Sequence, residues 1–147
     1  MLKIAFGRFN PPTIGHLKLF KEVDIILTTQ TQNKNNPLTY QQKIDIISEL
    51  FPSKIINEKY NNLFDYVEKN GNQFILYCGD DRVKDYSKIG CGLVTITRDE
   101  VSATLARKYV LDNDFLNFSK VVIGNNKYNI FNQIRVYYDQ IKKTHIT

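Results

Sequence analysis

The chain has 147 residues, and its 20 Lys and Arg against 15 Asp and Glu give a net charge of +5. This length, with ordinary fractions of apolar and charged residues, predicts one soluble globular domain over residues 1–147. No apolar run approaches a membrane span and the first residues lack a signal-peptide pattern, so we expect a cytoplasmic protein with no membrane partner.

The first half of the chain alternates apolar runs with helix-like segments. In order, the predicted elements are a strand over 2–6, a helix over 15–22, a strand over 23–28, a helix over 40–51 and a strand over 54–57. Thr39 is a good N-cap for the 40–51 helix, and Pro52 stops it. The polar segment 30–36 is expected to be a mobile loop.

The second half continues the alternation. Its predicted elements are a helix over 60–69, a strand over 74–78, a strand over 93–97 and helices over 102–112 and 127–142. Strands that alternate with helices imply an α/β fold with a parallel sheet covered on both faces. Ligands in such sheets bind beyond the carboxyl ends of the strands, where the loops that begin at Gly7 and Gly79 both lie.

The segment that follows the first strand reads Gly-Arg-Phe-Asn-Pro-Pro-Thr-Ile-Gly-His over residues 7–16. Gly7 lets backbone amides approach a ligand without a Cβ in the way. Gly15 and His16 fall at a helix start, where free N–H groups and the helix dipole favour an anion. The segment therefore predicts a phosphate site. A proline-rich turn with one surface histidine is the less favoured interpretation, because the spacing is long and specific.

A second segment with phosphate-binding character reads Val-Ser-Ala-Thr-Leu-Ala-Arg over residues 101–107. Ser102 is predicted to cap a helix, with Thr104 and Arg107 after it, so that amides, hydroxyls and a guanidinium converge on one point. An ordinary helix cap with a surface arginine explains this short segment equally well when it is taken alone. That explanation becomes improbable beside the first segment.

Together the two segments resemble the G-x-F-x-P-x-[H/T]-x-G-H and I-S-S-T-x-I-R signatures of the HxGH-type, cytidylyltransferase-like nucleotidyltransferase superfamily. The similarity extends over residues 2 to about 118. Thr13 stands where many members have a first histidine, a variation found among nicotinamide mononucleotide adenylyltransferases, which the chain resembles most. Lys43, where an arginine is frequent, and Ala103, in place of a serine, are departures. The resemblance implies a Rossmann-like fold.

The resemblance also implies an activity, which is transfer of AMP from ATP to a phosphorylated acceptor with release of pyrophosphate. No covalent intermediate is needed, since the transfer depends on positioning and on stabilising spread negative charge. Mg²⁺ or another divalent cation would accompany ATP and keep several waters, so no protein metal-ligand cluster is expected.

Residue roles follow from the match to the two signatures. The expected catalytic residues are His16, which would donate to the α-phosphate, Thr13, which would add a weaker hydrogen bond beside it, and Arg107. The other expected ATP-binding residues are Gly7, Arg8, Phe9, Gly15, Ser102 and Thr104. Asp80 and Arg82 are predicted near the ribose or the acceptor, although a helix cap and a local ion pair explain them equally well. Lys34 is a weaker candidate for a phosphate contact.

The identity of the acceptor stays open. Nicotinamide mononucleotide, giving NAD, is the first choice, and phosphopantetheine, FMN, glycerol phosphate or a sugar phosphate are alternatives, as is CTP in place of ATP. A catalytically weak nucleotide-binding regulator is a second hypothesis, since Thr13 replaces an imidazole.

The positive charge indicates anionic ligands without choosing among them. Nucleic acid is the less favoured partner, because the lysines are spread along the chain without an arginine-rich run or a basic-aromatic stripe. Cys78 and Cys91 have no metal-ligand spacing, and we expect buried free thiols. The sequence leaves open whether the chain forms a homo-oligomer.

Overall fold

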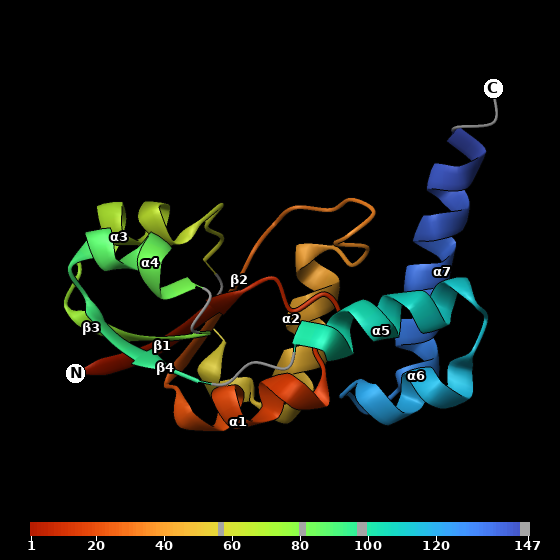
Figure 1. Ribbon diagram of the computed structural model, residues 1–147, viewed down its shortest axis with the longest axis horizontal. Helices are drawn as coiled ribbons and strands as arrows, with labels where there is room; N and C mark the ends of the chain where they lie inside the picture. Colours follow the sequence, from red (N-terminus) through yellow and green to blue (C-terminus); the bar gives the residue numbers. More distant parts are fainter. Residues whose placement is uncertain (56–57, 80–81, 97–99, 145–147) are drawn as a thin grey trace.

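A computed structural model describes residues 1–55, 58–79, 82–96 and 100–144 of the chain, without the side chains of residues 100 and 101. Its centre is one sheet of four parallel strands in the order β2-β1-β3-β4 (Figure 1). The strands are β1 Leu2–Gly7, β2 Ile25–Thr28, β3 Phe74–Cys78 and β4 Gly92–Thr95. The predicted α/β fold with a parallel sheet is thus confirmed.

Strand β1 lies inside the sheet, and its register fixes what surrounds it. Ala5 is opposite Ile26 of β2 on one side and Tyr77 of β3 on the other. Side chains of a strand alternate between the two faces, so Ile4 and Phe6 enter one core cluster and Ala5 another. Both faces of β1 are therefore buried, as in a doubly covered parallel sheet.

Helices α3 (Leu63–Asn70) and α4 (Val83–Tyr86) cover one face of the sheet (Figure 1), and the 3-10 turn η3 (Ser87–Ile89) follows α4. The core on this face joins Ile4, Leu76 and the free thiol Cys78 to Leu63 and Tyr66 of α3. Gly71 ends α3 with φ of 83°, a conformation that favours glycine.

Helices α1 (Ile14–Glu22) and α2 (Tyr40–Leu50) pack against the other face. Phe20 of α1 and Ile47 of α2 are fully buried beside Ala5 and Ile26 of the sheet. Thr39 caps α2 as predicted, since its side chain accepts from the backbone N–H of Gln42 over 3.1 Å.

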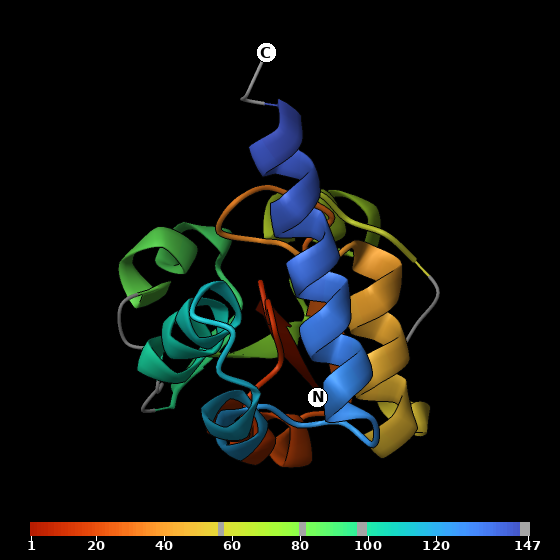
Figure 2. The same ribbon diagram turned by 90° about the vertical axis from the view of Figure 1, so that its right-hand side faces the viewer.

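A third cluster of apolar side chains joins the last three helices, α5 (Glu100–Leu111), α6 (Phe115–Val121) and α7 (Lys127–Thr144). Ala106, Phe118 and Ile134 are fully buried there, and Ile46 of α2 belongs to the same cluster. Figure 2 shows α7 running alongside α2. This packing brings the amino end of α5 to the same part of the molecule as the start of α1.

The predicted strand over 54–57 is wrong over its described part. A 3-10 turn, η1 (Pro52–Lys54), follows α2, and Ile55 forms only an isolated parallel bridge with Ile26. Residues 56 and 57 lie outside the described part of the chain. Pro52 favours the turn, and Lys54 Nζ is drawn to the carbonyl oxygens of Phe20 and Lys21 at the end of α1.

Two strands are shorter than predicted. Strand β2 begins at Ile25 because Asp24 turns its carboxylate back to the backbone N–H of Lys3, 2.9 Å away. Strand β4 ends at Thr95, before residue 97, which is not described. No helix in the described ranges is both long and apolar enough to cross a membrane.

Candidate functional site

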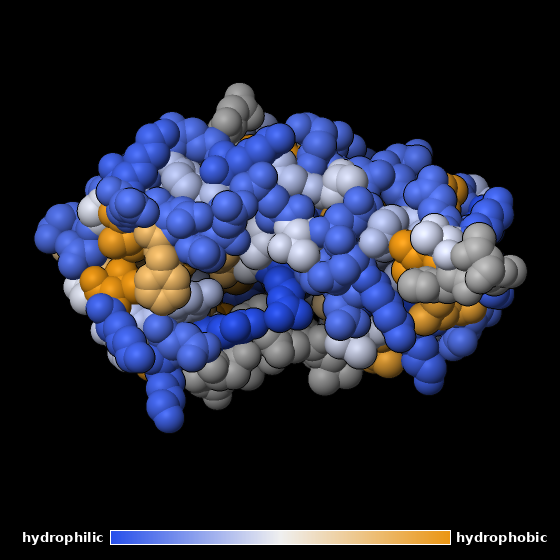
Figure 3. All heavy atoms as spheres, turned by 90° about the horizontal axis from the view of Figure 1, so that it is seen from above, coloured by the Kyte–Doolittle hydropathy of each residue, from blue (hydrophilic) through white to orange (hydrophobic). Residues whose placement is uncertain are grey.

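A hollow of about 250 Å³ lies beyond the carboxyl end of β1. Four separate segments line it: Arg8, Phe9 and Asn10 after β1; His16 of α1; Arg82 before α4; and Ala103, Thr104 and Arg107 of α5. The space-filling view shows a largely hydrophilic face that is hollowed near its middle and bordered there by strongly hydrophilic atoms (Figure 3). The structure thus brings together residues from both predicted phosphate segments.

The hollow is positively charged. Arg8, Arg82 and Arg107 all line it, and its described lining includes no carboxylate. Burial, with a smaller contribution from repulsion by Arg8, lowers the pKa of Arg107, whereas Tyr138 opposes this shift. Arginine stays charged despite such shifts, so the hollow favours an anion with several oxygens.

His16 is held in one orientation by the start of its own helix. Its ring Nδ1 accepts the backbone N–H of Thr13 over 2.9 Å, and its own backbone N–H donates to the Thr13 carbonyl over 2.9 Å. Since Nδ1 is the acceptor, the neutral ring carries its proton on Nε2. The imidazole is only 6% exposed.

Thr13 lies behind the imidazole. It is 0% exposed, and its hydroxyl is 3.3 Å from His16 Nδ1. The expected hydrogen bond from Thr13 to a phosphate therefore does not fit this arrangement, because the hydroxyl faces the ring and does not line the hollow. What Thr13 supplies is orientation of His16.

Phe9 explains why a glycine stands two residues before it. The ring of Phe9 folds back over Gly7, so that a Cβ at residue 7 would lie 2.8 Å from Phe9 Cζ. The same ring meets His16 edge-on, with ring centroids 4.9 Å apart, and Phe9 itself has φ of 45°, in the left-handed region. Gly7 thus makes room for a protein side chain, which the sequence did not reveal.

Asn10 is a site residue that the sequence analysis missed. Its side-chain amide donates to the Leu38 carbonyl over 3.0 Å and accepts the Leu38 N–H over 2.8 Å, while its own carbonyl accepts from Arg107 Nη1 over 2.9 Å. This network ties the loop after β1 to the segment before α2 and to α5. The signal was Asn-Pro at 10–11, a pair typical of turns.

Helix α5 begins at Glu100, so the prediction that Ser102 caps it is wrong. Ser102 lies within the first turn and is 4% exposed. Thr104 does line the hollow, and its hydroxyl accepts from Arg107 Nη2 over 3.3 Å.

Some predicted residues do not line this hollow. Gly15 lies on the second position of α1, and Gly7 lines a neighbouring hollow of about 170 Å³. That hollow shares Arg8 and Arg82 with the first, and its remaining lining residues are Phe6, Thr29, Asn61, Asn62 and Tyr86. Asp80 lies outside the described residues.

Lys34 is placed elsewhere. It lines a hollow formed with the ends of α5 and α7, and its carbonyl accepts the hydroxyl of Tyr138 over 3.0 Å. The structure therefore does not bring Lys34 to the hollow that holds His16. The loop around it forms a closed turn, because Asn33 and Asn36 exchange two backbone hydrogen bonds of 3.0 and 2.9 Å.

Within the described residues there is no group of three or more His, Cys, Asp or Glu side chains that could hold a metal ion. The described lining of the hollow, with three guanidinium groups, suits a metal that arrives bound to phosphates.

Comparison with known proteins gives a fold and no sequence family. No protein-family model matches the chain, and no curated protein sequence matches it. A solved structure assigned as a nicotinate-nucleotide adenylyltransferase from Vibrio parahaemolyticus superposes with a TM-score of 0.62 at 16% identity, covering 92% of this chain and 96% of that one.

A second similar structure is a bifunctional NMN adenylyltransferase/ADP-ribose pyrophosphatase from Francisella tularensis, solved with AMP and a manganese ion. The TM-score is 0.64 at 16% identity, and the alignment covers 98% of this chain but 53% of the other, about half its length. The chain therefore has the Rossmann-like fold of these two solved structures.

Proposed function

We propose that the protein is a nucleotidyltransferase that moves AMP from ATP to a phosphorylated, nucleotide-like acceptor and releases pyrophosphate. One observation carries the proposal: His16 of α1 and Arg107 of α5, far apart in sequence, line one positively charged hollow together with Arg8. The names of the two similar structures support the same class of reaction. Nicotinamide mononucleotide is the acceptor that we propose first, with NAD as the product.

The triphosphate of ATP would lie along the first turns of α5. Thr104 and Arg107 face the hollow there, and the amino end of a helix favours phosphate oxygens. Arg107 would hold the β- and γ-phosphates, and Arg8 would face them from the loop after β1. The divalent cation enters as part of the nucleotide substrate, bound to its phosphates.

In the transfer step, an oxygen of the acceptor phosphate attacks the α-phosphorus of ATP. The bond from that phosphorus to the α–β bridging oxygen breaks, and pyrophosphate leaves with the electron pair. His16 would donate its Nε2 proton in a hydrogen bond to the α-phosphate as negative charge develops. Thr13 keeps the ring in the required tautomer through its backbone N–H.

The acceptor would occupy the neighbouring hollow of about 170 Å³. Arg8 and Arg82 line both hollows, so they can bind the acceptor phosphate where it meets ATP. Tyr86 adds an aromatic ring to the lining of this hollow, which suits a flat group such as a nicotinamide or another base. The role predicted for Asp80 near the acceptor or ribose stays a prediction.

Pyrophosphate release from the purified protein tests the proposal. Mg²⁺ and ATP or CTP are supplied with nicotinamide mononucleotide, its nicotinate analogue, phosphopantetheine, FMN or glycerol 3-phosphate. We expect release that depends on nicotinamide mononucleotide or its nicotinate analogue, with the dinucleotide as product. If release depends on a different acceptor, the proposed reaction class stands and that acceptor takes the place of nicotinamide mononucleotide.

A matched pair of variants identifies the site. His16→Ala should slow release by about 10²–10³-fold, whereas Lys21→Ala, in the last turn of the same helix, should not change it. Absence of release with every acceptor, while ATP still binds, would contradict the enzyme and favour a nucleotide-binding regulator.

A further inference from the structure

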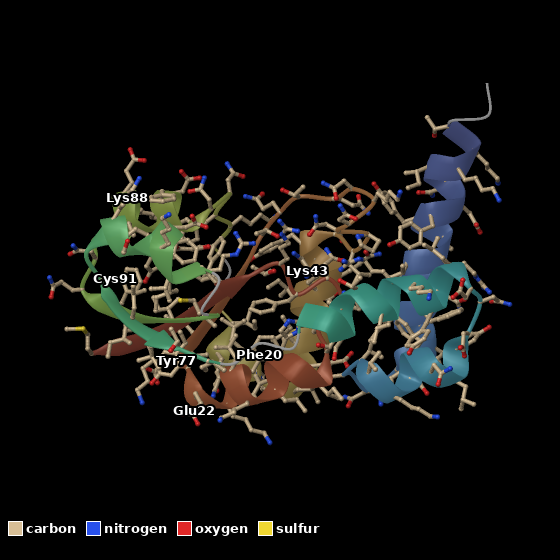
Figure 4. The ribbon with its side chains drawn as sticks, viewed as in Figure 1. Phe20, Glu22, Lys43, Tyr77, Lys88 and Cys91 are labelled. Carbon is tan, nitrogen blue, oxygen red and sulfur yellow. The ribbon has the colours of Figure 1, made fainter. Side chains whose placement is uncertain are left out.

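Lys43 is a buried lysine on the apolar face of α2. Its side chain is 0% exposed and lies in the middle of the molecule (Figure 4). Ile44 and Ile47 beside it on the helix are buried as well, so Lys43 occupies a position where the helical pattern calls for an apolar residue. Burial lowers its pKa to about 7.

The ammonium of Lys43 has a partner for each of its three protons. Nζ donates to the carbonyl of Arg8 over 2.8 Å, to the carbonyl of Thr29 over 2.7 Å and to the hydroxyl of Thr29 at 3.2 Å. All three acceptors are neutral. With its donors used and no exposed surface, Lys43 has no group left for a ligand, so it cannot act as a direct phosphate contact in this arrangement.

These hydrogen bonds hold the ends of two strands together. Arg8 directly follows β1, and Thr29 directly follows β2. Thr28 reinforces the link, because its hydroxyl lies 2.8 Å from the Gly7 carbonyl and 3.1 Å from the Arg8 carbonyl. The single Thr28 proton is shared between these two carbonyls, with the Gly7 carbonyl nearer, so Lys43 is the main donor to the Arg8 carbonyl and anchors the backbone at this residue.

The side chain of Arg8, unlike its carbonyl, is exposed. Arg8 lines the hollow that holds His16 and also the neighbouring hollow that is lined by Gly7 and Tyr86. It lines a third hollow of about 250 Å³ as well, together with Thr29 and residues of the 31–36 turn. Arg8 thus lies at the junction of three hollows, so the direction of its side chain depends on how the backbone at residue 8 is held.

We propose that Lys43 is a positioning residue that fixes the Arg8 carbonyl against the end of β2 and so holds the Arg8 guanidinium between the nucleotide and the acceptor. This inference rests on the proposed function. It assigns Lys43 no contact with substrate, and it makes the effect of Lys43 conditional on Arg8. A buried lysine that served only to stabilise the fold would act whether or not Arg8 carried a guanidinium.

A double-mutant cycle tests this dependence. Lys43→Met keeps the volume and removes the donors, and it is measured in the natural background and in Arg8→Ala. In the natural background we expect kcat/KM and the affinity for MgATP each to fall by about tenfold or more, since misplaced binding groups reduce catalysis strongly. In the Arg8→Ala background the same substitution should change both by less than about twofold.

Lys54→Met is the matched control. Lys54 Nζ also donates to two backbone carbonyls, those of Phe20 and Lys21, over 2.7 and 3.0 Å, but it does not contact the Arg8 loop. The effects of Lys54→Met on kcat/KM and on MgATP affinity should therefore be the same with and without Arg8→Ala. If Lys43→Met does not fold, Lys43→Gln, which keeps two donors, takes its place in the cycle and should show a smaller coupling of the same sign.

Equal effects of Lys43→Met in both backgrounds would overturn the proposal and leave a purely structural lysine. So would an unchanged affinity and kcat/KM in the natural background. MgATP affinity, measured by calorimetry, separates this inference from the proposed function. Coupling in affinity without any pyrophosphate release would support the positioning role and reject the transferase, and a natural protein that binds no MgATP would reject both.

Discussion

Arg107 of α5 donates from Nη1 to the backbone carbonyl of Asn10 over 2.9 Å, joining residues 97 positions apart. Its Nη2 donates to the Thr104 hydroxyl over 3.3 Å. The guanidinium therefore holds the loop after β1 against α5 and at the same time lines the hollow. The two phosphate segments are physically connected through this one side chain.

Replacing Arg107 with lysine should weaken ATP binding although the charge is kept. A lysine ammonium lacks the planar fork, so it cannot hold the Asn10 carbonyl, Thr104 and a phosphate together. We expect Arg107→Lys to lower kcat/KM for ATP by about tenfold or more. Steady-state kinetics measure this, with Lys108→Ala, an exposed neighbour on α5, as the control. A fully active lysine variant would mean that a positive charge at residue 107 is sufficient for ATP binding and that the planar fork is not needed.

His16→Ala should slow the chemical step more than it weakens substrate binding. Loss of a donor aimed at developing charge typically lowers kcat by about 10²–10³-fold. The affinity for MgATP should change little, because Arg8, Thr104 and Arg107 still line the hollow. Single-turnover kinetics and calorimetry separate the two effects. If instead affinity collapsed and kcat did not, His16 would be a binding group only.

Gly7→Ala should destabilise the protein through Phe9. The added Cβ would lie 2.8 Å from the ring, and the fully buried ring has little room to move. Forcing extra atoms into a packed core costs about 1–3 kcal/mol. Chemical denaturation measures the free energy of unfolding, and Phe9→Leu, which shortens the side chain, should make Gly7→Ala much less costly. Full additivity of the two substitutions would argue against this contact.

The stability of the protein should depend on pH through Lys43. The pKa of an exposed lysine is 10.5, whereas burial lowers the pKa of Lys43 to about 7 in the folded protein, so between these values the unfolded chain binds more protons. The free energy of unfolding should therefore rise with pH above about 7, and below about 7 the full cost of burying the charge is present.

The measurement compares the natural protein with Lys43→Met at several pH values. Other titrating groups are common to both proteins, so the difference isolates Lys43. Between about pH 7 and about pH 10, we expect the free energy of unfolding of the natural protein to rise by more than about 1 kcal/mol relative to that of Lys43→Met. A difference that stays flat would mean that burial does not lower the pKa of Lys43 in the folded protein.

The strand–loop–helix segment around Gly7 and His16 was predictable because its structure is local. A strand, a glycine, two prolines and a helix start follow one another directly in the sequence. The hollow combines this segment with α5, a meeting that the resemblance to the two nucleotidyltransferase signatures implied. Thr39 as a cap was likewise readable, since a cap depends on neighbouring residues.

What the sequence did not reveal depends on distant partners. The Asn10 amide is paired with Leu38, 28 residues away, and the Lys43 ammonium with Arg8, 35 residues away. A lysine at an apolar position of the 40–51 helix did indicate that its side chain is buried. Its partners could not be predicted, because backbone carbonyls occur at every residue. The strand predicted over 54–57 was wrong because a short apolar run becomes a strand only where the fold pairs it with a sheet, and the sequence does not show that pairing.

The strand order β2-β1-β3-β4 has a consequence during synthesis of the chain. When β1, α1 and β2 have emerged from the ribosome, the other edge of β1 is still unpaired, because its partner Phe74–Cys78 has not yet been made. An apolar strand with an open edge attracts other chains. Products that terminate before β3 are therefore expected to aggregate or to need chaperones, whereas completion of β3 closes that edge.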